Sequence, residues 1–169
     1  FDIGGGTTNV SVFSRGKTVG CTCLDIGGRL VRFLPNTSTV DGIDPKLWKI
    51  AQSHGIEICR GTELSLESIR ALTALMAQAL EDLLGGGSPL TQSFASPNSS
   101  PWPLGVSVDA VSFSGGVGRC YYEKKQVSGI FSDIGSDLAQ ALRESGISRN
   151  FTVIEPLETA RATVIGAGC

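Results

Sequence analysis

Two glycine-rich segments carry residue types that could bind a phosphorylated ligand. The first reads DIGGGTTN and covers residues 2–9. A strand that ends near Asp2 would place its carboxylate at the edge of a sheet. The glycines that follow let the turn direct several N–H groups into one concavity, which suits an anion, and the threonines add hydroxyl donors. The residues of this candidate phosphate loop are Asp2, Gly4, Gly5, Gly6, Thr7 and Thr8.

The carboxylate of Asp2 narrows the choice of ligand. It would repel a bare phosphate but suits a phosphate that arrives with Mg²⁺, which Asp2 would contact through water. The segment therefore favours a magnesium nucleotide over a simple anion. A glycine-rich hairpin turn capped by its threonines explains the same residues equally well, and both interpretations stay open on this segment alone.

The second segment reads FSGGVGRC, at residues 113–120, after an apolar run. Gly115, Gly116 and Gly118 allow close backbone approach, and Arg119 could face a phosphate or stack on an adenine. A ligand at the carboxyl end of such a strand is the usual arrangement in α/β sheets. The alternative is a strand-to-helix turn that needs glycine for its geometry. The segment matches neither the GxGxxG dinucleotide fingerprint nor the Walker A pattern.

The elements that must position these segments change in type along the chain. A hairpin comes first, with a tight turn at residues 15–17, and helices and strands then alternate, which predicts an α/β fold with a mixed sheet and helices outside it. Strands are predicted over 8–14, 18–25, 106–113 and 151–154, and helices over 45–53, 65–84, 133–145 and 157–166. Residues 29–34 favour a third strand, with a short helix as the alternative. Asp44 and Ser65 are the expected N-caps of the first two helices.

Residues 85–105 are rich in glycine, proline and serine and predict a flexible surface loop. Trp102 within it is expected to dock on the protein surface. Net charge is −2 with a pI near 5.4, which lacks the basic signature of a nucleic-acid-binding domain. No apolar run approaches the ~20 residues of a membrane span.

The chain of 169 residues fits one domain or a large piece of a longer protein. It opens at Phe1, inside a strand-and-turn unit, so we expect that further residues precede it. Five cysteines without a CxxC pair and a single histidine favour reduced thiols over a disulfide framework or a metal site.

The order of the motifs resembles the second half of the actin, sugar-kinase and Hsp70 nucleotide-binding superfamily. FDIGGGTTNVSVF is similar to its second phosphate loop, FSGGVGR to its adenosine loop, and RATVIGAG to its late connecting helix. The resemblance implies an actin-like ATPase (ribonuclease H-like) domain with a mixed five-stranded sheet flanked by helices. Residues 1–169 would form a single domain, the C-terminal nucleotide-binding half.

A further segment, GCTCLDIGGRLVRF at residues 20–33, resembles the ethanolamine utilization family EutA. That family is understood as a chaperone-like, ATP-dependent reactivating factor for adenosylcobalamin-dependent ethanolamine ammonia-lyase. It releases damaged cobalamin so that intact cofactor can bind. The resemblance implies ATP and Mg²⁺ as ligands, ethanolamine ammonia-lyase as partner, and a bacterial cytoplasmic setting that includes microcompartments.

The resemblance also assigns roles to residues whose motifs match. The glycines and threonines at 4–8 would hold the β- and γ-phosphates, and Asp2 would face Mg²⁺ through water. Gly115, Gly116, Gly118 and Arg119 would cradle the ribose, adenine or α-phosphate. Gly27 and Gly28 are assigned to backbone geometry rather than to ligand binding.

Two departures limit the comparison. Asn9 stands where Hsp70-like loops usually carry Asp. The superfamily's first phosphate loop and water-activating residues lie in an N-terminal half that these residues do not contain, so the catalytic residues are unknown and the isolated chain is expected to hydrolyse ATP poorly. A small-molecule kinase, an actin-like filament protein and an Hsp70-like chaperone remain alternative functions.

Overall fold

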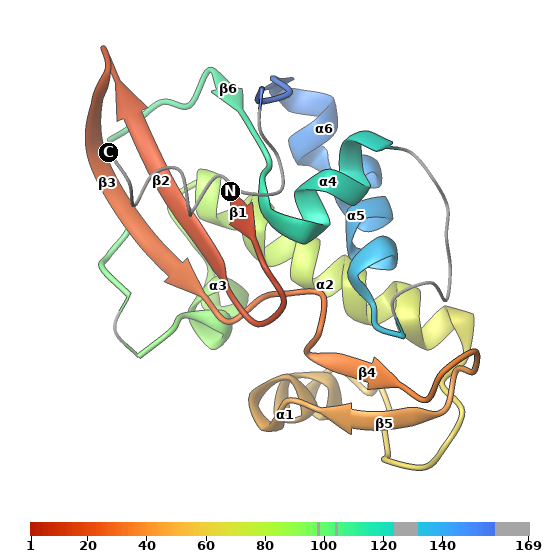
Figure 1. The fold of residues 1–169 in the computed structure, drawn as a ribbon. Coiled ribbons are helices and arrows are strands. Elements are labelled where there is room, and N and C mark those ends of the chain that lie inside the picture. Colours follow the sequence, from red (N-terminus) through yellow and green to blue (C-terminus); the bar gives the residue numbers. More distant parts are fainter. Residues whose placement is uncertain (98, 104, 124–131, 158–169) are drawn as a thin grey trace.

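The computed structural model describes residues 1–97, 99–103, 105–123 and 132–157 and shows a mixed α/β structure (Figure 1). In Figure 1 the long hairpin at the N-terminal end and the segment that holds α4, α5 and α6 lie on either side of β1. Most of the helix predicted over 157–166, with the RATVIGAG motif, falls outside the described residues.

The N-terminal strands form an antiparallel sheet in the order β1 (Asp2–Ile3), β2 (Thr8–Ser14) and β3 (Lys17–Leu24). Alternation of β-branched and polar residues produces β2, with Thr8 and Val10 buried and Asn9 and Ser11 exposed. Arg15 and Gly16 turn the chain with φ of 51° and 76°, the left-handed pair that a tight hairpin turn requires. The predicted hairpin is confirmed.

A second small unit follows, with β4 (Val31–Phe33) paired to β5 (Val40–Ile43) and then helix α1 (Pro45–Ser53). The strand predicted over 29–34 is present in shorter form, whereas its partner β5 was not predicted. The carboxylate of Asp44 accepts hydrogen bonds from the backbone N–H groups of Lys46 and Leu47, at 2.8 and 3.1 Å, which confirms it as the N-cap of α1.

The C-terminal part alternates strand and helix. Its elements are β6 (Ala110–Val111), α4 (Gly115–Glu123), α5 (Gly135–Glu144), α6 (Gly146–Asn150) and β7 (Thr152–Val153), and β6 pairs with β7 in parallel. The strand predicted over 106–113 is wrong in length. Only Ala110 and Val111 have a strand beside them, because β7 itself extends over just two residues.

A single five-stranded sheet is not what the structure describes. Within the described residues there are three small sheets, of three, two and two strands. Two of them are nevertheless connected, because Ile3 donates its N–H to the carbonyl of Ser114 at 2.9 Å and Ser114 donates to the carbonyl of Phe1 at 2.8 Å. β1 therefore lies between β2 and the segment that follows β6.

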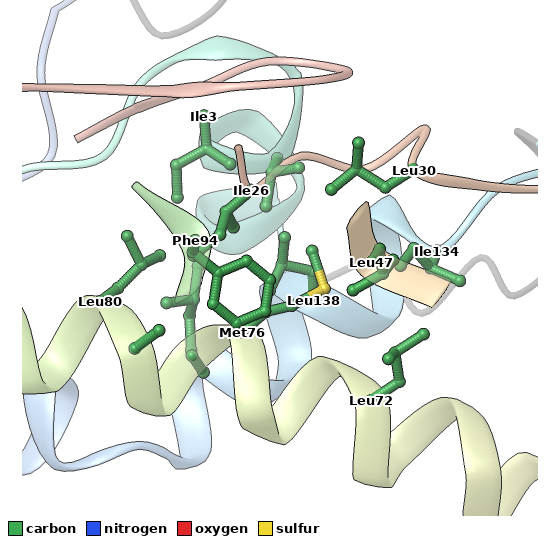
Figure 2. Packing of buried hydrophobic residues seen from close by; sticks show 14 of the residues in the cluster. Ile3, Ile26, Leu30, Leu47, Leu72, Met76, Leu80, Phe94, Ile134 and Leu138 are labelled. Carbon is green, nitrogen blue, oxygen red and sulfur yellow. The ribbon is translucent and has the colours of Figure 1, made fainter. Parts of the chain in front are cut away.

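Helix α2 (Leu66–Leu84) forms one wall of the core (Figure 2), and Ser65 caps it as predicted. Its buried face packs against α5. Side chains from β1, the loop after β3, α1 and α5 fill the space above it. The labelled core residues are Ile3, Ile26, Leu30, Leu47, Leu72, Met76, Leu80, Phe94, Ile134 and Leu138. Burial of these apolar surfaces is the main driving force for folding.

The predicted flexible loop at 85–105 is wrong in its first half, which holds helix α3 (Pro89–Phe94). Ser88 caps this helix and the Thr91 hydroxyl donates to the carbonyl of Ala79 on α2 at 3.0 Å. Phe94 is fully buried. The composition of these residues predicts a loop. The buried ring of Phe94 and the hydrogen-bonded hydroxyls of Ser88 and Thr91 nevertheless hold the segment against α2. Trp102 packs on the core, as predicted.

The end of α3 and the residues after it also hold the end of β3. Asp25 donates its backbone N–H to the carbonyl of Phe94 at 2.7 Å, and its carboxylate accepts from Lys46 Nζ at 2.7 Å and from the Ser96 hydroxyl. Burial works to raise the pKa of Asp25, but the hydrogen bonds from Lys46 and Ser96 and the charge of Lys46 outweigh it, so the pKa is lowered.

This network makes the free energy of unfolding depend on pH in the acidic range. Because the folded-state pKa of Asp25 lies below its ordinary value of 3.8, the contribution is present above that pH and is lost as the pH falls through the folded pKa. Asp25→Asn should lower the free energy of unfolding at pH 7 by about 1 kcal/mol, as for a partly exposed ion pair. Urea unfolding between pH 7 and pH 3 measures both effects. Asp41→Asn, which changes an exposed carboxylate paired to Arg60, is the control and should change little.

Candidate functional site

The glycine turn at residues 4–7 connects β1 to β2 and presents unpaired amides. Gly4 donates its N–H to the carbonyl of Thr7 at 2.9 Å. The carbonyls of Gly4 and Gly5 accept from the N–H groups of Gly28 and Arg29, at 3.0 and 2.6 Å. Among the described residues, the N–H groups of Gly5, Gly6 and Thr7 donate to no backbone or side-chain acceptor. Three successive amides thus remain for an anion.

The DIGG sequence at residues 25–28 packs against this turn. A Cβ at Gly27 would lie 2.5 Å from the carbonyl carbon and oxygen of Gly5, so only glycine permits this backbone contact. The hydroxyl of the buried Thr8 donates to the carbonyl of Ile26 at 2.8 Å. Thr8 therefore fastens the turn to residues 25–28, and its hydroxyl proton is used there rather than offered to a ligand. The packing agrees with the assignment of Gly27 and Gly28 to backbone geometry.

The start of α4 packs against β1, directly before the glycine turn. Gly115 has a φ of 78°, and a Cβ there would lie 2.4 Å from the carbonyl oxygen of Ile3 and 2.8 Å from Oδ1 of Asp2. A Cβ at Gly118 would lie 2.8 Å from the carbonyl carbon of Phe113, which closes the turn into the helix. Gly116 is exposed and faces open space. The two predicted segments are thus brought together, Asp2 beside Gly115.

Asp2 lies at the junction of the two segments. Its Oδ1 accepts a hydrogen bond from the Ser114 hydroxyl at 3.2 Å, and its side chain is half-buried. Within the described residues there is no group of three or more His, Cys, Asp or Glu side chains that could hold a metal ion. A cation here would therefore depend on water and on oxygens of its ligand, as Mg²⁺ commonly does.

Arg119 lies on α4, where its Nε is 3.7 Å from a carboxylate oxygen of Glu123. Both side chains are about half exposed, with fractions of 44% and 51%. An exposed pair of this spacing contributes only about 0.3–0.5 kcal/mol, so Arg119 can exchange Glu123 for a ligand at little cost.

Sequence reasoning missed a second arginine beside the turn. The side chain of Arg29 lies over Gly5, and its Nε is 3.7 Å from Oδ2 of Asp133. Arg29 is 75% exposed, so its guanidinium can reach a ligand at the turn. Its position directly after Gly27 and Gly28, in LDIGGR, is the sequence feature that could have indicated this arginine.

Asp133 connects this arginine to the start of α5. Its Oδ1 accepts from the N–H of Gly135 at 2.9 Å. Burial raises the pKa of Asp133, while the bond from Gly135 and the charge of Arg29 offset part of that rise. Burial, together with the nearby charge of Asp133, also raises the pKa of Asp137.

Comparison with known proteins places the chain in a family. The family model described as ethanolamine utilisation protein EutA matches residues 1–169, so the chain belongs to this family. The curated relative "Ethanolamine ammonia-lyase reactivase EutA" of Salmonella typhimurium is 36% identical over 171 residues, and the protein of the same name from Escherichia coli K12 is equally similar. The match covers 99% of this chain and 35% of each relative, so the chain spans about a third of their length.

No solved structure matches the chain. Of the described helices, none is both long and apolar enough to cross a membrane.

Neighbouring glycines in α4 provide a test of this packing. Gly115→Ala should lower the free energy of unfolding by about 2 kcal/mol or more, because a methyl group would overlap the Ile3 carbonyl and the positive φ would be strained. Gly116→Ala should be neutral or stabilise by up to about 1 kcal/mol, since the site is open and helical. Urea unfolding measures the stability of both variants. An equal loss of stability in the two would contradict the close contact between Gly115 and the Ile3 carbonyl.

Proposed function

We propose that this chain forms one wall of a Mg-ATP site in a reactivating factor for ethanolamine ammonia-lyase. The observation that carries the proposal is the meeting of the glycine turn, with its three available amides, and the start of α4 at Asp2. The names of the two curated relatives supply the partner enzyme.

The amides of Gly5, Gly6 and Thr7 would hold the β- and γ-phosphates, with Gly4 shaping the turn. The positive end of α4 adds to this attraction. Arg29 lies at the rim of the turn, where its guanidinium would pair with phosphate oxygens. Asp2 would orient water on Mg²⁺, and the cation would offset charge on the phosphates.

Gly116 and Arg119 would line the nucleoside side of the site, since Gly116 leaves open space at the start of α4. Gly115 and Gly118 would act indirectly, because their missing side chains allow α4 to approach β1 and Phe113. Thr8 would likewise act by fixing the turn through Ile26.

The proposed parent fold is an actin-like ATPase. The parallel β6–β7 pair and the hydrogen bonds that join Phe1 and Ile3 to Ser112 and Ser114, just after β6, support this proposal. In this proposal residues 1–169 are the C-terminal nucleotide-binding half. The other half would supply the second wall and the catalytic residues, so this half alone should hydrolyse ATP poorly.

In the complete protein, the proposed cycle couples ATP to a chaperone-like change in ethanolamine ammonia-lyase. That change releases damaged cobalamin so that intact adenosylcobalamin can bind. The proposed setting is the bacterial cytoplasm, at or near the microcompartment that would hold the lyase.

Reactivation provides the functional test. Ethanolamine ammonia-lyase is inactivated with cyanocobalamin and then given the full-length protein, Mg-ATP and adenosylcobalamin, while ammonia release is followed. The wild-type protein should restore activity only with ATP. Gly6→Leu should reduce the rate of recovery at least about tenfold, or ~1.4 kcal/mol, because the side chain would occupy the open space over the turn.

Gly85→Leu is the matched control, since Gly85 is exposed at the end of α2 with a φ of −86° and lies outside the site. It should reactivate like the wild-type protein. Recovery without ATP, or full recovery with Gly6→Leu, would contradict the nucleotide role of the turn.

A further inference from the structure

Arg29 is held over the glycine turn by its backbone and by the aliphatic part of its side chain. Its backbone N–H donates to the carbonyl of Gly5 at 2.6 Å. A Cβ at Gly5 would lie 3.1, 3.4 and 3.5 Å from Cδ, Cγ and Cβ of Arg29. The side chain therefore lies directly on the bare backbone of the turn, and its guanidinium begins from a fixed place at the rim.

The guanidinium has one carboxylate partner among the described residues. Its Nε lies 3.7 Å from Oδ2 of Asp133. Within the part of the chain that the structure describes, its two Nη groups donate to no acceptor. An arginine carries five N–H donors in a planar fork, so a contact at Nε leaves the outer donors for phosphate oxygens.

Asp133 is a rigid partner because its own atoms are fixed. Its side chain is only 10% exposed, and its Oδ1 accepts from the N–H of Gly135 at 2.9 Å. Its backbone forms an antiparallel bridge with Arg32, and the next residue, Ile134, donates to the carbonyl of Gly28 at 3.0 Å. Oδ1 is thus already used, and Oδ2 is the oxygen that faces the arginine.

We propose that Asp133 is a positioning residue for nucleotide binding, which holds the Arg29 guanidinium so that its outer N–H groups meet the phosphates at the glycine turn. The inference rests on the proposed Mg-ATP site and adds a residue that acts there only through Arg29. An exposed arginine loses rotamer freedom when a ligand orders it, and one that is already held loses less. Asp133 would thus raise the affinity by preorganisation.

The negative charge of Asp133 makes the direction of its effect informative. A carboxylate near the turn repels phosphate, so a role limited to charge predicts that its removal strengthens the binding of Mg-ATP. A positioning role predicts weaker binding as long as Arg29 is present, because the ligand must then order a loose guanidinium. The sign of the change therefore separates the two roles.

The test is a double-mutant cycle in the full-length protein, with Mg-ATP binding measured by titration calorimetry. Asp133→Asn keeps an oxygen for the N–H of Gly135 and removes the charge that holds Arg29. Alone, this change should weaken Mg-ATP binding at least about threefold, within the range of couplings between residues in contact. Combined with Arg29→Ala it should cause no further weakening, because no guanidinium is left to hold.

Asp41→Asn is the matched control. It also removes one carboxylate from an ion pair, since Oδ1 of Asp41 lies 3.5 Å from an Nη of Arg60, but this pair does not involve Arg29. The Mg-ATP affinity of this variant should equal that of the wild-type protein.

Arg29→Lys covers the case in which Asp133→Asn does not fold. Arg29 is 75% exposed, so the fold should tolerate the change. A lysine keeps the charge but has a single ammonium group, which lacks the separate donors of the fork. Arg29→Lys should therefore weaken Mg-ATP binding at least about threefold. Wild-type affinity in this variant would contradict the held guanidinium.

The remaining results distinguish a failure of this inference from a failure of the proposed function. If the wild-type protein binds no Mg-ATP, the nucleotide site is wrong and the role of Asp133 with it. If Mg-ATP binds but Asp133→Asn leaves the affinity unchanged or raises it, only the positioning role is wrong. Equal weakening with and without Arg29 would show that Asp133 serves the fold rather than the arginine.

Discussion

The structure depends on the close backbone contact that Gly27 and Gly28 make with their surroundings. Gly27 lies against Gly5 and Gly6, and Gly28 lies against Gly135, where a Cβ would be 2.8 Å from the Gly135 Cα. The carbonyl of Gly28 also accepts from Ile134 at 3.0 Å. One dipeptide therefore holds both the candidate phosphate loop and the start of α5. The carbonyls of Gly4 and Gly5 accept hydrogen bonds in this contact, whereas the N–H groups of Gly5, Gly6 and Thr7 donate to no acceptor among the described residues.

Helices α4 and α5 both begin near the glycine turn, but their positive ends are used differently. The carboxylate of Asp133 accepts from Gly135 and so already occupies the end of α5. The first turn of α4 lies against Asp2 and Ser114, at the junction of the two glycine segments. A helix end carries roughly half a positive charge, and in the proposed site that of α4 would act on a ligand at the turn.

How far the sequence predicted this arrangement depends on the range of the interactions. The β2–β3 hairpin, α1 and α2 follow from turn residues, caps and periodicity that lie within a few residues of each other. β5 and α3 were missed because part of their stability comes from residues farther along the chain. Besides its pairing with β4, Val40 of β5 bonds to Gly61 and Thr62, and Thr91 of α3 donates to Ala79 on α2. The candidate loops were found from their glycines. Their meeting at Asp2 and Gly115 and the place of Arg29 over Gly5 arise only from the tertiary fold.

The charges at the junction favour a ligand that brings its own cation. At an effective dielectric constant of about 20, a carboxylate and a phosphate oxygen ~6 Å apart repel by roughly 3 kcal/mol. The end of a helix contributes about 0.3–1 kcal/mol in the opposite direction, which does not balance that repulsion. Arg29 is exposed and shares its charge with Asp133, so it offsets only part of the remainder. A divalent cation between Asp2 and the phosphates would reverse the sign of the largest interaction. For that reason Asp2 disfavours free phosphate in the proposed site and favours a magnesium nucleotide.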